Sequence, residues 1–305
     1  MKGPASGSVA AGCGAWREVG CGGPGGRVKK LGVWRLSSGI PRHRVALRYR
    51  LGMIETPTAL LPRYPGTNAD EETARALRVA GFDATIVPSA VLTREAIAAA
   101  HLIVFSGGFS YGDYVMSGRI AQLITQQKLN GALEEFVERG GYVLGICNGF
   151  QILTKLGLLP KASLIENTSG RFQCRWVKLR VKNEQNPFLR ELPADVDIEF
   201  PIAHAEGRLV APPGEAARYA ADGRAALTYA GENPNGSEEA IAGLQNASGR
   251  VFGLMPHPER FLYANQHYDR DWSEKSGEAT WGWGYYFFKG IYRAVSGEAS
   301  LLASA

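Results

Sequence analysis

Residues 142–157 read YVLGICNGFQILTKLG and contain a change from a strand pattern to a helix pattern. Residues 142–147 form an apolar run typical of a buried strand, whereas residues 148–157 have helical spacing and end at Gly157. Between the two runs, residues 145–149 (GICNG) match the G-x-C-x-G form of a nucleophile elbow, with cysteine in place of serine. The stretch therefore predicts a buried strand, a sharp turn that carries Cys147, and a helix.

The elbow pattern gives each of its residues a role. A side chain at Gly145 or Gly149 would clash with the crossing backbone, which explains the two glycines. The helix that begins after Cys147 directs the positive end of its dipole at the sulfur and favours the thiolate. The backbone N–H of Asn148 is then free to face an oxyanion. A buried core cysteine is the alternative interpretation, but the strand-to-helix switch between two glycines favours a nucleophile.

Strand and helix patterns alternate on both sides of this stretch. Ahead of it, we expect strands at 58–63, 82–87 and 101–108 and helices at 71–81, 93–100 and 119–139. Pro62 weakens the first strand, and either Asn68 or Asp70 is a suitable cap for the first helix. This order, with strands that are almost continuously apolar, predicts a mostly parallel sheet covered by helices on both faces.

Strand patterns dominate the second half of the chain. They are SLIEN, QCRWVKLRV, DIEFPIAH, RLVA, AALTYA and VFGLM, between about residues 163 and 255. Their succession without intervening helices predicts added antiparallel strands. A final aromatic helix is expected at 282–295, where a core or partner face is a better interpretation than a cofactor site.

Composition excludes several classes of protein. The chain has 305 residues, of which 45% are apolar and 21% charged, as in ordinary globular proteins. No stretch approaches 18 uninterrupted apolar residues, so a membrane-spanning helix is not predicted. The cysteines at 13, 21, 147 and 174 form no CxxC pair, which argues against a zinc ribbon or disulfide framework and for a reducing, cytoplasmic location. Nucleotide and metal motifs are also missing from the sequence, so we expect no cofactor and no metal in this chain.

The first 52 residues differ from the rest. They hold ten Lys and Arg against one acid and are rich in glycine, which leaves 24 bases and 28 acids for residues 53–305. The mildly acidic remainder argues against nucleic-acid binding. Met53 opens a new segment, so we expect a folded domain at 53–305 and, at 1–52, either sequence that precedes the true start or a disordered basic leader. A targeting peptide is the third alternative.

A second candidate site segment is MPHPE at 255–259, directly after the predicted strand VFGLM. The two prolines stiffen the backbone around His257. A rigid histidine followed by Glu259 suits a general base that a carboxylate orients, although a single histidine is often structural. The spacing alone does not show that His257 reaches Cys147.

Two further segments are weaker candidates. The loop GGFSYGD at 107–113 follows a predicted strand, and its glycines allow a backbone N–H to face a ligand. A second oxyanion donor and a plain tight loop are equally good interpretations of this loop. His204 and Glu206, in PIAHAEGR, either line a site or only end a strand.

Together these residues resemble the class I (triad) glutamine amidotransferases, and among them the glutaminase subunits of phosphoribosylformylglycinamidine synthase. The resemblance runs from about residue 57 to 295. Seven blocks carry it in order: RYPGTNAD (63–70), GGFSYGDYVMSGRIA (107–121), LGICNGFQILTKLGLLP (144–160), NTSGRFQCRWVKL (167–179), IAHAEGR (202–208), NPNGSEEAIAGL (233–244) and GLMPHPER (253–260). It implies a flavodoxin-like, mostly parallel sheet with helices on both faces.

The resemblance also implies a catalytic triad. Cys147 would attack the carboxamide of L-glutamine and form a thioester, His257 would move the proton, and Glu259 would orient His257. The backbone N–H groups of Gly108 and Asn148 would form the oxyanion hole.

Further implications concern substrate and partners. Gln151, one helical turn after Cys147, would help to bind glutamine. Ammonia would pass to a separate synthetase subunit, which uses ATP and Mg, and a small third subunit would help to join the two.

Three positions depart from the family pattern. Pro62 lies inside the first strand, Ala205 stands where glycine is usual, and MSGRIA at 116–121 replaces a smaller, more apolar run. None of them removes a residue of the triad. The alternatives are an amidotransferase for another acceptor, a free-standing cysteine hydrolase, and a catalytically silent regulatory module on the same fold.

Overall fold

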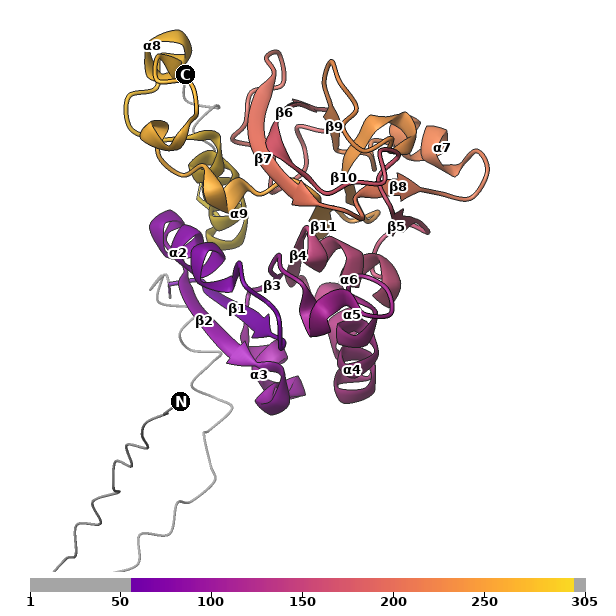
Figure 1. The fold of residues 1–305 in the computed structure, drawn as a ribbon. Helices are drawn as coiled ribbons and strands as arrows, with labels where there is room; N and C mark the ends of the chain where they lie inside the picture. The colour runs from indigo at the N-terminus through magenta and orange to yellow at the C-terminus, as the bar shows by residue number, and fades with distance from the viewer. Residues whose placement is uncertain (1–55, 299–305) are drawn as a thin grey trace, which may run out of the picture. The chain divides into compact units, whose positions relative to one another are not determined.

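A computed structural model describes residues 56–298, so the predictions for residues 1–52 lie outside the described residues. The main sheet has nine strands in the order β2-β1-β3-β4-β11-β10-β9-β6-β7 (Figure 1). Its first five strands are parallel: β2 (Asp83–Pro88), β1 (Thr58–Arg63), β3 (Leu102–Phe105), β4 (Tyr142–Ile146) and β11 (Val251–Leu254). This half confirms the predicted parallel sheet.

The other strands of the main sheet are antiparallel to their neighbours. They are β10 (Ile241–Gln245), β9 (Leu227–Tyr229), β6 (Gln173–Val181) and β7 (Ile198–His204). Strands β5 (Ser163–Ile165) and β8 (Arg208–Val210) form a separate antiparallel pair. The antiparallel second half is therefore confirmed as well.

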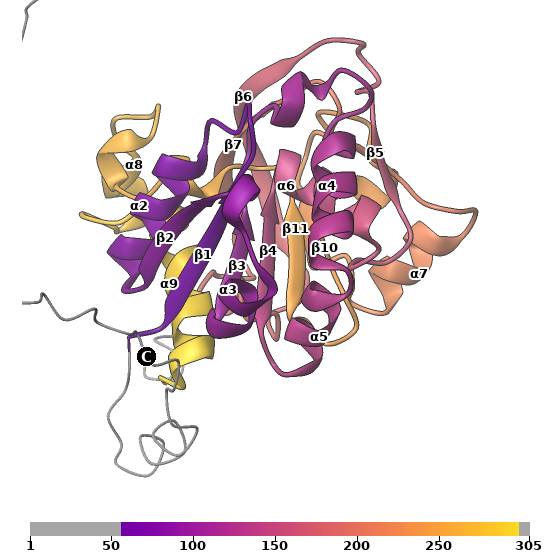
Figure 2. The ribbon, with the colours of Figure 1, turned by 90° about the horizontal axis from the view of Figure 1, so that it is seen from below.

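Helices cover both faces of the parallel half (Figure 2). Helices α2 (Asp70–Ala80) and α9 (Trp283–Ser296) pack together on one face. The other face carries α3 (Arg94–Ala99), α4 (Arg119–Leu129), α5 (Ala132–Glu138) and α6 (Asn148–Leu156). Because both faces are covered, β3, β4 and β11 are buried along almost their whole length, which explains their apolar sequences.

The expected cap of the first helix is wrong. The N-cap of α2 is Ala69, and no side chain caps the helix. Asp70 is instead the first helical residue, and its carboxylate pairs with Arg63 at the end of β1. Pro62 does lie inside β1, and the register of β1 with β3 ends at Leu60, so the missing N–H of the proline falls beyond that ladder.

One strand and two α-helices had no counterpart among the predictions. Strand β10 contains Gly243, whose place leaves room for the Phe252 ring, and a glycine weakens a strand signal. Helices α7 (Glu215–Ala221) and α8 (Trp272–Ser276) have only seven and five residues and no side-chain cap. Among the described residues, none of the helices combines the length and the apolar character that a membrane crossing requires.

Candidate active site

The carboxyl ends of three neighbouring parallel strands meet at one place. Strand β3 leads to Gly107, β4 to Cys147 and β11 to His257, and β4 lies between the other two. This edge is where open α/β sheets bind their ligands. The sheet order thus brings together the three segments that the sequence analysis proposed separately.

Cys147 lies on a strained elbow between β4 and α6. It is the N-cap residue of α6 with φ 50° and ψ −105°, a conformation that non-glycine residues rarely adopt. Its backbone N–H donates to the Leu254 carbonyl on β11 at 2.8 Å, which fixes the turn to the neighbouring strand. The predicted strand, turn and helix are therefore present, and the thiol lies at the N-terminus of α6.

The two glycines of the elbow are required by close packing. A Cβ at Gly145 would lie 2.7 Å from the Gly149 backbone. A Cβ at Gly149 would overlap the Phe105 carbonyl at the end of β3. Helix α6 therefore rests directly on the two strands that lead to the site.

His257 and Glu259 form a buried pair beside the thiol. The Nδ1 of His257 lies 2.6 Å from Oε1 of Glu259, and both side chains are almost fully buried. Burial disfavours the charged imidazole, but the Glu259 carboxylate and the Cys147 sulfur outweigh it and raise the pKa of His257 to about 10. The imidazole of His257 is therefore expected to be protonated at neutral pH.

Strand β7 closes the site from the other half of the sheet. The Cys147 thiol donates to the Ala203 carbonyl at 3.7 Å. The backbone N–H of His257 donates to the Pro201 carbonyl at 2.8 Å. Neither Ala203 nor Pro201 was a candidate, because a residue that acts through its backbone leaves no side-chain signal in a sequence.

The glycine loop after β3 forms another wall of the site. A Cβ at Gly107 would lie 2.8 Å from Cε1 of His257, so the loop packs against the imidazole. Gly108 has φ 143°, and a Cβ there would lie 2.7 Å from the Asn68 nitrogen. Asn148 is the first residue of α6, where backbone N–H groups have no acceptor within the helix.

This geometry agrees with a known family. The CobB/CobQ-like glutamine amidotransferase domain matches residues 56–290, which is most of the chain. The chain belongs to this family of glutamine amidotransferases.

The similar amidotransferases are synthase subunits. The chain is 43% identical over 204 residues to phosphoribosylformylglycinamidine synthase subunit PurQ of Thermotoga maritima, across 67% of this chain and 88% of that relative. It is 41% identical to the subunit PurQ of Aquifex aeolicus, across 65% of this chain and 88% of the relative. A chain in the structure of PurLQS from Thermotoga maritima superposes with a TM-score of 0.65 at 36% identity, covering 79% of this chain and all of that one.

Gln151 of the amidotransferase lies in a polar network beside the elbow. Its Nε2 donates to the Glu206 carbonyl at 2.6 Å, and its Oε1 accepts from Nδ2 of Asn148 at 2.9 Å. The same Asn148 amide donates to Asp113 at 3.2 Å, and its oxygen accepts from the Ser110 N–H. Among the described residues, the Gln151 amide uses one of its two N–H groups and one lone pair in these bonds. Asp113 is the last residue of the candidate loop at 107–113, and the sequence predicted no separate role for it.

His204 lies at the end of β7 and is buried. Its Nδ1 lies 3.2 Å from Oδ1 of Asn167, which also accepts from the Gly207 N–H, so Nδ1 carries the proton. Burial and the nearby charge of His257 lower the pKa of His204 to about 4. His204 is therefore a neutral imidazole at the end of β7.

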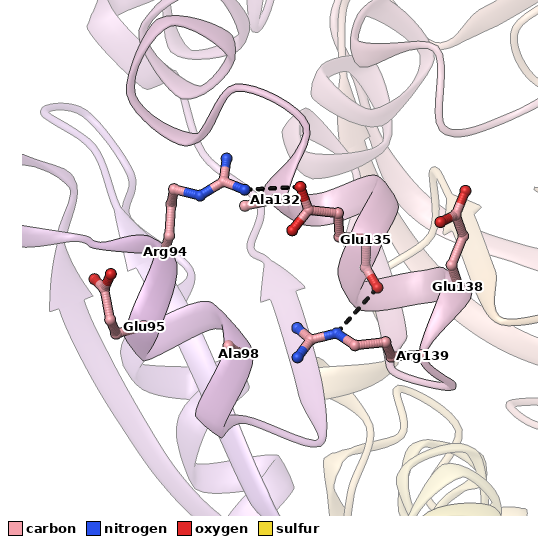
Figure 3. A pocket seen from close by; sticks show the side chains of 7 residues that line it. All are labelled: Arg94, Glu95, Ala98, Ala132, Glu135, Glu138 and Arg139. Carbon is pink, nitrogen blue, oxygen red and sulfur yellow. Dashed lines mark hydrogen bonds and ion pairs between the residues drawn. The ribbon is translucent and has the colours of Figure 1, made fainter.

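Glu206 lines a cavity of about 630 Å³ that also includes Met116, Arg119 and Lys155. Its carboxylate accepts from the Ser117 N–H at 3.3 Å, which joins the loop after β3 to the end of β7. A cavity of about 370 Å³ between α3 and α5 shares no residue with this one (Figure 3). It is bridged by the ion pair of Arg94 and Glu135, and its lining of charged side chains and alanines contains none of the site residues.

One group of side chains has the composition of a metal site. The possible ligand atoms of Glu72, His257 and Glu259 lie within 4.8 Å of one another. Glu72 already forms an ion pair with Arg260 at 2.9 Å, so a positively charged side chain lies beside these possible ligands.

Proposed function

We propose that this chain is the glutaminase subunit of phosphoribosylformylglycinamidine synthase. It hydrolyses L-glutamine through a cysteine thioester and supplies ammonia to a separate ATP-dependent subunit in purine biosynthesis. The observation that carries the proposal is Cys147 on a strained elbow, beside the buried pair of His257 and Glu259. The relatives named phosphoribosylformylglycinamidine synthase subunit PurQ support the choice of reaction.

The first half of the reaction forms the thioester. The Cys147 thiolate attacks the carboxamide carbon, and backbone N–H groups of Gly108 and Asn148 stabilise the resulting oxyanion. The C–N bond then breaks while the His257 imidazolium gives its proton to the leaving nitrogen. Ammonia, a γ-glutamyl thioester and a neutral imidazole result.

The second half releases glutamate. The neutral His257 takes a proton from water as the water attacks the thioester carbonyl. The C–S bond breaks, and thiolate and imidazolium are restored. Glu259 keeps the imidazole oriented with its Nδ1 proton toward the carboxylate, and Gln151 helps to position glutamine.

Partners and location follow from the same proposal. Ammonia passes to the synthetase subunit, where ATP and Mg are used, and a small third subunit joins the assembly. The similar chain in the structure of PurLQS supports this set of partners. We place the reaction in the cytoplasm and assign no cofactor to this chain.

The test is glutamate release from L-glutamine by the full chain. It is measured alone and with the synthetase and small subunits plus ATP, Mg and formylglycinamide ribonucleotide. Strong stimulation by the complete assembly is expected, with amidine formation at the same rate. Activity that ignores the assembly would support a free-standing hydrolase or another acceptor.

Two cysteine variants complete the test. Cys147→Ala should abolish glutamate release, whereas Cys174→Ser should leave it unchanged because Cys174 is exposed on β6. Amidine formation from added ammonia should persist with Cys147→Ala, since the synthetase chemistry is intact. A wild-type complex that forms but releases no glutamate would favour the regulatory module.

A further inference from the structure

Arg260 lies next to the triad without a role in the reaction described above. It is the last residue of the turn η4 (Pro258–Arg260), and its Nε donates to Oε1 of Glu72 at 2.9 Å. Glu72 belongs to the first turn of α2, 188 residues earlier in the chain. Helix α2 packs on η4, so this ion pair joins the first helix of the described fold to the loop that carries the triad.

The surroundings of Glu259 call for a cation. Its Oε1 is paired with His257, whereas its Oε2 is buried and has no hydrogen-bond partner among the described residues. The Glu72 carboxylate lies within 4.8 Å of the same group. Two carboxylates this close are costly unless positive charge lies beside them. Burial disfavours the charged guanidinium, but Glu259 and Glu72 together raise the pKa of Arg260.

We propose that Arg260 is a positioning residue for glutamine hydrolysis: it is the permanent counter-charge of the Glu259 carboxylate, and Glu72 holds it there. The inference rests on the proposed function, because it concerns charge balance during that reaction. His257 loses its positive charge when it protonates the leaving ammonia. Arg260 cannot be deprotonated, so Glu259 still has one cationic neighbour and keeps accepting a hydrogen bond instead of taking the proton.

The proposal predicts opposite electrostatic effects for the two partners. His257 is faced by Glu259 from its own loop, by Cys147 from the elbow, by Glu72 from α2 and by the neutral His204 from β7. Arg260 acts on this group through Glu259 and Glu72, the two carboxylates beside it. Arg260→Gln removes positive charge and should raise the pKa of His257 further. Glu72→Gln removes the negative charge that is paired with the Arg260 guanidinium, so it should lower the pKa of His257. An ion pair that does not act on the charge of His257 would give no shift of its pKa in either variant.

The experiment is an NMR titration of the His257 imidazole in the full chain. It compares the wild type with Arg260→Gln, Arg260→Lys and Glu72→Gln. Arg260→Lys keeps the charge and should titrate near the wild type. Arg218→Gln, which removes an exposed ion pair on α7, is the matched control and should shift nothing. In the assembled synthase, kcat for glutamate release should fall about tenfold in Arg260→Gln with little change in KM, because the group touches no substrate.

Folding is checked by circular dichroism for every variant. If Arg260→Gln does not fold, Glu72→Gln and Arg260→Lys decide the matter, the first by a lowered pKa and the second by an unchanged one. Shifts of the same sign in Arg260→Gln and Glu72→Gln, or no shift in a folded Glu72→Gln, would overturn the proposal. A wild-type assembly without glutaminase activity would instead refute the proposed function, and the titration would still test the charge relationship.

Discussion

The Cys147 thiol points at the Ala203 carbonyl, 3.7 Å away, although β4 and β7 are separated by four other strands in the sheet. The antiparallel half therefore curves back until its last strand lies over the carboxyl ends of the parallel half. Strand β7 also packs on η4, which carries Glu259. The site is thus enclosed by both halves of the sheet, and the parallel half alone would leave the thiol open on one side.

The elbow should be intolerant of a methyl group at Gly149. We expect Gly149→Ala to lower the free energy of unfolding by at least about 3 kcal/mol, because the added Cβ overlaps the Phe105 carbonyl. Gly131→Ala is the matched control, since its φ is +82° but nothing lies within 4 Å, and it should cost about 1–2 kcal/mol. Chemical denaturation measures both, and equal losses would show that α6 can move away from β3.

Glu259→Gln should remove the main support of the His257 charge. In the wild type the pKa of His257 is raised to about 10, so its contribution to stability is complete below pH 6.5 and is lost as the pH rises through 10. The variant should lack this alkaline loss, and kcat should fall by about 100-fold or more. Denaturation between pH 6 and 10.5 checks the first expectation. It would be contradicted if the free energy of unfolding of the variant fell with pH as steeply as that of the wild type.

His204 should affect stability at the opposite end of the pH range. Its pKa is lowered to about 4 in the folded protein, so its contribution is present above pH 6.5 and is lost as the pH falls through 4. His204→Phe should flatten this acid limb and, at neutral pH, cost about 1 kcal/mol for the lost hydrogen bond to Asn167. Denaturation series at pH 4 to 7.5 on both proteins make the comparison. If the variant loses stability at acid pH as the wild type does, other groups cause that loss.

The Asp113 carboxylate should hold the loop after β3 to the catalytic helix. It accepts from the Gly118 N–H at 3.1 Å and from Asn148 at 3.2 Å, and burial raises its pKa. Asp113→Ala should raise KM for glutamine about tenfold, the equivalent of one hydrogen bond of about 1.4 kcal/mol. Asp113→Asn keeps an acceptor oxygen and tolerates the φ of 52°, so it should stay near the wild type. Steady-state kinetics of the assembly test both variants. Equal KM values in the two variants would show that Asp113 does not hold the loop to α6.

Local sequence patterns predicted most elements of the parallel half and the candidate triad. The elbow is encoded within sixteen residues, because the strand period, the two glycines and the helix follow one another directly. The prolines around His257 and the carboxylate two residues later are equally local. The resemblance to glutamine amidotransferases added roles for Gly108, Asn148 and Gln151. Short elements without caps, such as α7, and the glycine-containing β10 gave no comparable signal.

Local patterns in the chain thus predicted the class of fold, the candidate nucleophile and the pairing of His257 with Glu259, since each depends on neighbouring residues. Three further contacts follow from the folded structure: His257 lies beside Cys147, Ala203 accepts from the thiol, and Glu72 reaches Arg260. These contacts join residues 56 to 188 positions apart. They depend on the order of strands and on the curvature of the sheet, which are set by the packing of the whole domain and leave no mark on any short stretch of sequence.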